Sequence, residues 1–139
     1  MTNVSLEQFK LIDQIDICID EINLLKEVYD DTLAKKSVTE KDFVTIIALN
    51  KSIFTDIGTL FDLDRRSVSL FQLFGNLVIE KWIKKFKIKG VLDRRNKQVA
   101  HIDRKELEGR KLTPMLIRDI IELKEFLLFL KKEINQLKS

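Results

Sequence analysis

The chain has 139 residues, of which 45% are hydrophobic and 34% are charged, and its net charge is +3. This length and balance indicate one folded domain over residues 1–139 and argue against disorder. A single cysteine and a single histidine exclude an internal disulfide and a His/Cys zinc site within one chain, so we expect no metal and no other cofactor.

The first predicted helix runs from Ser5 to about Leu33. Ser5 and Gln8 have the spacing of a capping box, and apolar residues follow in alternating steps of four and three. Cys18 lies on this apolar face, which predicts a buried core residue rather than a reactive thiol. Four acids of this helix are spaced like a solvent-exposed face: Asp13, Asp16, Asp20 and Glu21. We find no paired carboxylates at a metal-ligand spacing.

Two further helices are predicted in the middle of the chain. The second begins at Thr39, which has capping-box spacing with Asp42, and continues to Leu60. A polar loop over Asp62–Ser67 follows it. The third begins at Ser69 and ends in a lysine-rich turn that meets Gly90, a typical C-terminal stop.

A short helical segment over Val91–Ile102 and a charged loop over Asp103–Leu112 precede the last helix. Thr113 and Pro114 predict its first turn. Its apolar residues, from Leu116 to Leu137, keep a 3.5-residue period, which indicates coiled-coil-like packing on the first helix or on a second subunit. With one proline and four glycines in the chain, the predicted fold is all-α. It is an up-and-down bundle of four main helices plus one short helix.

The charge is strongly segregated along the chain. Residues 81–111 hold 12 Lys/Arg and 4 Asp/Glu, a local balance of +8, while the remaining residues sum to −5. The lone histidine, His101, lies inside the basic segment, six residues after Arg95. The segment therefore combines a group that titrates near neutral pH with a permanent cation.

This combination suits cleavage of RNA, which carries its own nucleophile in the 2′-hydroxyl. The reaction needs a proton acceptor or donor with a pKa near ambient pH, which histidine provides. It also needs a cation for the developing phosphorane charge, which arginine provides. On an ideal helix Arg95 and His101 lie about 120° apart and about 9 Å along the axis. The pair therefore converges only in a distorted helix or where two copies meet.

The segment Arg95-Asn96-Lys97-Gln98-Val99-Ala100-His101-Ile102-Asp103 resembles the HEPN superfamily signature. That signature is an arginine, often followed by Asn, Asp or His, with a histidine after four to six intervening residues. The form found here is most similar to the branch of abortive-infection proteins of the U type. The stretch from Phe61 to Leu73 also resembles that branch.

The resemblance implies a metal-independent endoribonuclease, a toxin or phage-defence effector, whose homodimer forms a shared cleft. It implies that Arg95 contacts the scissile phosphate, that His101 transfers protons, and that Asn96 orients the pair or binds phosphate. RNA is the expected partner, and superfamily members often work with nucleotidyltransferase-like antitoxins. Backbone contacts to RNA are expected from three further cations: Arg94, Lys97 and Arg104.

Two other functions fit the sequence. The basic segment predicts a non-catalytic module that holds RNA or a nucleotide, and the periodic face of residues 116–137 predicts a helical partner-binding protein. No apolar run approaches 18 residues, and Met1–Phe9 lacks a basic start and an apolar signal core. We therefore expect a cytoplasmic protein that does not contact membranes.

Overall fold

The computed structural model describes residues 6–61, 70–95 and 115–137. These residues form six helices and no strand, which confirms the predicted all-α bundle. The helices are α1 (Leu6–Lys35), α2 (Glu40–Leu60), α3 (Leu70–Phe74), α4 (Asn76–Lys85), α5 (Lys89–Arg95) and α7 (Ile117–Gln136).

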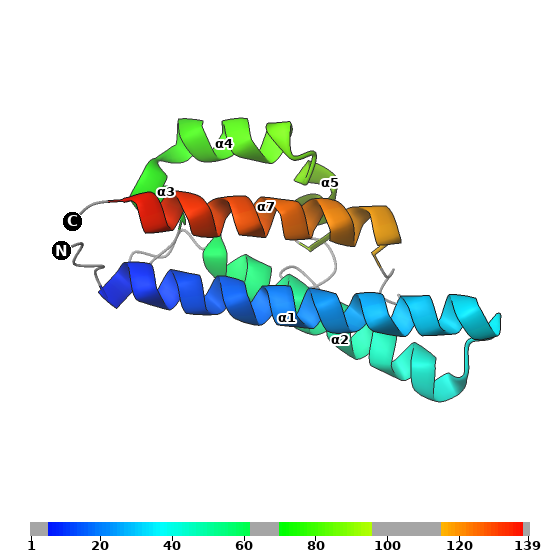
Figure 1. Ribbon diagram of the computed structural model, residues 1–139. Helices are drawn as coiled ribbons and strands as arrows, with labels where there is room; N and C mark the ends of the chain where they lie inside the picture. The colour runs from blue at the N-terminus through cyan, green and yellow to red at the C-terminus, as the bar shows by residue number, and fades with distance from the viewer. Residues whose placement is uncertain (1–5, 62–69, 96–114, 138–139) are drawn as a thin grey trace, which may run out of the picture.

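The four longer helices alternate in direction, as in an up-and-down bundle (Figure 1). Helices α1 and α2 form a long antiparallel hairpin, and α7 lies along the other side of α1. Helix α4 covers the face of α7 that is turned away from α1 (Figure 1). Because α1 is ten residues longer than α7, the far end of the hairpin extends beyond it.

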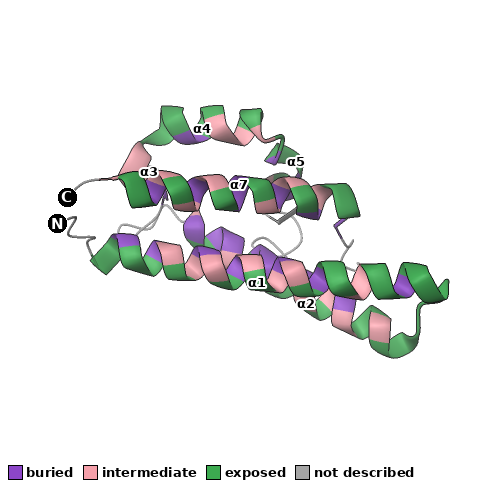
Figure 2. Ribbon diagram, in the orientation of Figure 1, coloured by how far each residue is buried: buried purple, intermediate pink, exposed green. Residues whose placement is uncertain are grey.

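The core lies between α1, α2 and α7, where the buried faces of the helices meet (Figure 2). The apolar stripe predicted for the first helix is buried, and Cys18 is fully enclosed within it. The periodic face of α7 is buried as well, and α7 packs on α1. The 3.5-residue repeat is therefore used within the chain, on the first helix, which is one of the two predicted packing alternatives; binding of a separate partner stays a prediction.

The start of α2 agrees with the sequence prediction. The Thr39 hydroxyl accepts from the Asp42 N–H and the Asp42 carboxylate accepts from the Thr39 N–H, each at 3.1 Å. Lys35, at the end of α1, lies 2.7 Å from the same carboxylate. The lysine and the backbone of Thr39 lower the pKa of Asp42 to about 2.

The predicted third helix is broken, and its predicted stop is wrong. Gly75 separates α3 from α4 with φ 83° and ψ 158°, a backbone conformation that is nearly exclusive to glycine. Helix α4 then ends at Lys85, and Lys87 takes the positive φ of 58°. Gly90 does not end a helix but lies inside α5.

The last helix begins later than Thr113 and Pro114 predict, because the chain before it is held by tertiary hydrogen bonds. The buried Met115 donates its N–H to Asn50 Oδ1 at 2.8 Å and accepts from the Tyr29 hydroxyl at 2.7 Å. Asn50 in turn donates to the Ile46 carbonyl at 2.8 Å. Helical geometry therefore starts only after Leu116, the N-cap of α7.

Aromatic rings attach α4 to α7. Trp82 lies 5.0 Å from Phe129 between ring centroids, and Phe86 lies 4.9 Å from Phe129 and 5.5 Å from Phe126. Phe74 of α3 meets Trp82 at 4.9 Å. Edge-on and tilted pairs of this kind are favourable beyond their buried area, so the break at Gly75 is compatible with firm packing on both sides.

One helix of the described residues, α2, is long and apolar enough to cross a membrane by length and composition alone. The sequence contains no unbroken apolar run of 18 residues because polar residues interrupt the apolar residues of α2. The helix is apolar enough only on average over its length. The later part of its apolar face, from Ile46 to Leu60, is buried against the rest of the bundle, whereas Phe43 and Val44 near its start are exposed. Such a helix is weak evidence for a membrane span.

Candidate functional site

The predicted Arg–His motif begins at the end of α5. Arg94 and Arg95 are the last two residues of that helix, and nothing is described of their side chains. Asn96, Lys97, His101 and Arg104 lie outside the described residues. Whether Arg95 and His101 meet therefore stays a prediction.

Helix α5 is fixed to the bundle just before the motif. Ile88 and Val91 are buried, and α5 packs against α2. Leu92 extends this contact as a half-buried residue of the core. The backbone at the start of the motif thus belongs to a helix that is packed on the core, which favours a precise site.

The surface that leads to α5 is basic. Five lysines of α4, the following turn and the first position of α5 are exposed, and the described residues 81–93 contain one acid, Asp93. Lys85 also lies 5.6 Å from the centroid of Phe86 and 5.5 Å from that of Phe129, a cation–π arrangement. Helix α1, in contrast, carries eight acids and three lysines. The exposed lysines are Lys81, Lys84, Lys85, Lys87 and Lys89.

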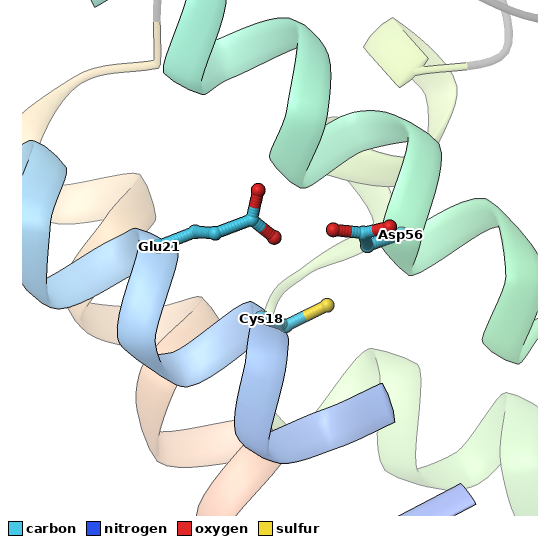
Figure 3. Close-up of side chains that lie close together, drawn as sticks. All are labelled: Cys18, Glu21 and Asp56. Carbon is cyan, nitrogen blue, oxygen red and sulfur yellow. The ribbon is translucent and has the colours of Figure 1, made fainter. Parts of the chain in front are cut away.

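A second group of polar side chains lies between α1 and α2. Cys18 and Glu21, one turn apart on α1, face Asp56 of α2, and one ligand-type atom from each lies within 4.8 Å of the others (Figure 3). Ser52, one turn before Asp56, donates its hydroxyl to Glu21 Oε2. The other oxygen, Glu21 Oε1, is buried without a hydrogen-bond partner. Two helices thus each supply two polar groups to one place.

The electrostatics of this group are unfavourable for negative charge. Burial and the neighbouring Asp56 raise the pKa of Glu21 to about 7, although the Ser52 hydroxyl acts in the opposite direction. Burial, followed by the charges of Asp56 and Glu21, raises the pKa of the Cys18 thiol well above its usual range. Within the described residues, neither carboxylate forms an ion pair. A proton or a bound cation would relieve the repulsion.

The sequence prediction correctly placed Cys18 in the core but treated Glu21 as part of a solvent-exposed acidic face. Asp13 and Asp20 are exposed, and Asp16 pairs with Lys131 of α7 at 2.7 Å. Glu21 differs because it sits three residues after Cys18, at the edge of the buried stripe. Asp56 stands directly before the buried Ile57. The sequence signal for this group was therefore an acid beside a core position on each of two antiparallel helices.

No protein-family model, curated protein or solved structure matches this chain.

Proposed function

We propose that the protein is a metal-independent endoribonuclease of the HEPN type, a phage-defence effector or toxin of the cytoplasm. The observation that carries this proposal is the Arg95–His101 spacing inside a segment of charge +8. The all-α bundle supports it, as does the rigid placement of α5, whose last residues begin the motif. The exposed lysines before α5 add an attractive field for a polyanion.

In the proposed reaction, the 2′-oxygen attacks the adjacent phosphorus while the bond from phosphorus to the 5′-oxygen breaks. His101 moves the proton from the 2′-hydroxyl, and the leaving 5′-oxygen receives a proton. Arg95 neutralises the charge that develops on the phosphorane oxygens through its planar guanidinium. Asn96 orients the pair or binds phosphate, and Arg94, Lys97 and Arg104 contact the RNA backbone. The products are a 2′,3′-cyclic phosphate and a 5′-hydroxyl.

We propose that two copies form the cleft, because each chain has a single histidine. Helix α7 supports a symmetric contact through a second, exposed apolar face, separate from the one buried on α1. Its members are spaced by four and seven residues and therefore lie on one side of the helix: Ile117, Ile121 and Leu128. A monomer in a mass measurement at assay concentration would contradict this arrangement. A nucleotidyltransferase-like antitoxin remains a proposed further partner.

The test is cleavage of RNA by the purified chain in the presence of a chelator. We expect His101→Ala and Arg95→Ala each to slow cleavage at least about 100-fold, the lower end of general acid–base contributions. Arg118→Ala, which removes an exposed arginine of α7, is the matched control and retains the parental rate. Salt-sensitive binding without cleavage would instead identify a non-catalytic RNA-binding module.

A further inference from the structure

We propose that Cys18, Glu21 and Asp56 form a binding site for a divalent transition-metal ion, with Zn²⁺ as the best match. This site is separate from the proposed ribonuclease motif and does not depend on it. It also differs from the His/Cys site that the composition excludes, because its donors are one thiolate and two carboxylates. All three come from described, well-packed parts of α1 and α2.

The placement of the donors carries the first step. Cys18 and Glu21 are one turn apart on α1, so both side chains leave the same face of the helix. The Cys18 sulfur and the Glu21 carboxylate point toward Asp56 across the gap between the two helices (Figure 3). One potential ligand atom from each residue lies within 4.8 Å of the other two. Three donors from two helices thus already surround one point in the folded chain.

One unpartnered oxygen at this point indicates a missing ligand. The Cys18 side chain is completely buried and forms no disulfide. Glu21 Oε1 is buried without a hydrogen-bond partner, although a buried carboxylate oxygen without a partner is costly. A cation at the centre of the three donors binds this oxygen and the sulfur, and it removes the repulsion between the two acids.

The chemistry of the donors selects the ion. Zn²⁺ accepts thiolate sulfur at about 2.3 Å and carboxylate oxygen at about 2.0–2.2 Å. Hard ions such as Mg²⁺ and Ca²⁺ take oxygen ligands and disfavour sulfur. With three protein donors, the fourth tetrahedral position is left for a water molecule or for the hydroxyl of Ser52. On binding, the sulfur–hydrogen bond breaks, the sulfur–metal bond forms, and the proton passes to solvent.

The group lies at the edge of the core. Glu21 and Asp56 are half-buried and Ser52 is exposed, so the carboxylates lie on the outer side and the buried sulfur on the inner side. The metal would then link the middle of α1 to the last part of α2.

The test uses the full chain, freed of metal by a chelator and dialysed, and titrated with Co²⁺ as a spectroscopic probe. We expect a saturable thiolate-to-cobalt charge-transfer band that excess Zn²⁺ abolishes. Cys18→Ala eliminates the band, and Asp56→Asn weakens Co²⁺ binding more than about tenfold, since even outer-shell partners contribute that much. Asp20→Asn, which alters an exposed acid on the same helix, leaves the titration unchanged.

A second readout does not depend on sulfur absorption. Zn²⁺ raises the thermal midpoint of the parent protein and of His101→Ala, but not that of Asp56→Asn, whose helical content is checked by circular dichroism. No charge-transfer band in the parent, or Zn²⁺ stabilisation that persists in Asp56→Asn and disappears in His101→Ala, would overturn the proposal. Because no RNA is present, the result is independent of the ribonuclease assay.

Discussion

At the scale of single residues, Glu21 couples protonation to folding in the metal-free protein. Its pKa is about 7 in the folded chain, against an ordinary value of about 4.5. Folding therefore favours the protonated form, and the resulting stability is fully present below about pH 4.5 and lost as the pH rises through about 7. Burial and Asp56 raise the pKa of Glu21, and the Ser52 hydroxyl opposes them.

We predict that, with a chelator present, the parent protein melts at a higher temperature at pH 5.5 than at pH 8. Glu21→Gln removes most of that difference and stabilises the protein at pH 8 by about 1 kcal/mol, a figure reduced for solvent screening. Asp20→Asn is the control and keeps the full difference. An unchanged pH dependence in Glu21→Gln would assign the effect to another group.

A second residue-scale prediction concerns Asn50, which holds the chain where it enters α7. Asn50→Ala leaves the buried N–H of Met115 without an acceptor, and we expect a loss of about 2–3 kcal/mol in the free energy of unfolding. Tyr29→Phe removes one hydrogen bond to the same residue and costs about 1 kcal/mol. Urea unfolding measures both, and equal losses in the two variants would contradict the central role of Asn50.

At the scale of elements, we expect substitution of glycine by alanine to have opposite effects on stability at two positions. A Cβ at Gly75 or Gly90 meets no atom within 4 Å, so only the backbone decides. Gly75→Ala is strained by its positive φ and costs about 1–3 kcal/mol. Gly90→Ala, inside α5, stabilises by up to about 1 kcal/mol. Thermal unfolding compares the pair, and destabilisation by both substitutions would contradict this account.

The elements also show which features a single sequence predicts. Apolar period correctly predicted α1, α2 and the buried face of α7, and capping spacing correctly predicted the start of α2, because these signals are local; the Ser5 cap predicted for the first helix lies outside the described residues. The break at Gly75 was missed because Leu70–Trp82 keeps helical periodicity across it. The late start of α7 was missed because it depends on hydrogen bonds from Met115 to Tyr29 and Asn50, which are 86 and 65 residues away.

At the scale of the whole molecule, the bundle separates two regions of different character. The acidic helix α1 holds the Cys18–Glu21–Asp56 group together with α2, while α4, the following turn and the start of α5 carry exposed lysines. The sequence predicted the basic region because its charges are contiguous. It could not predict the Cys18–Glu21–Asp56 group, because Glu21 and Asp56 become neighbours only when the α1–α2 hairpin forms.

The central claim is that the protein cuts RNA with the help of His101, and that the nucleophile is the 2′-hydroxyl of the RNA itself. The most direct measurement is cleavage, in a chelator, of one RNA and of the same RNA carrying 2′-O-methyl groups. We predict that the parent cuts the unmodified RNA to 5′-hydroxyl ends and leaves the methylated RNA intact, and that His101→Ala is at least about 100-fold slower. Cleavage of the methylated RNA, or parental rates in His101→Ala, would contradict the claim.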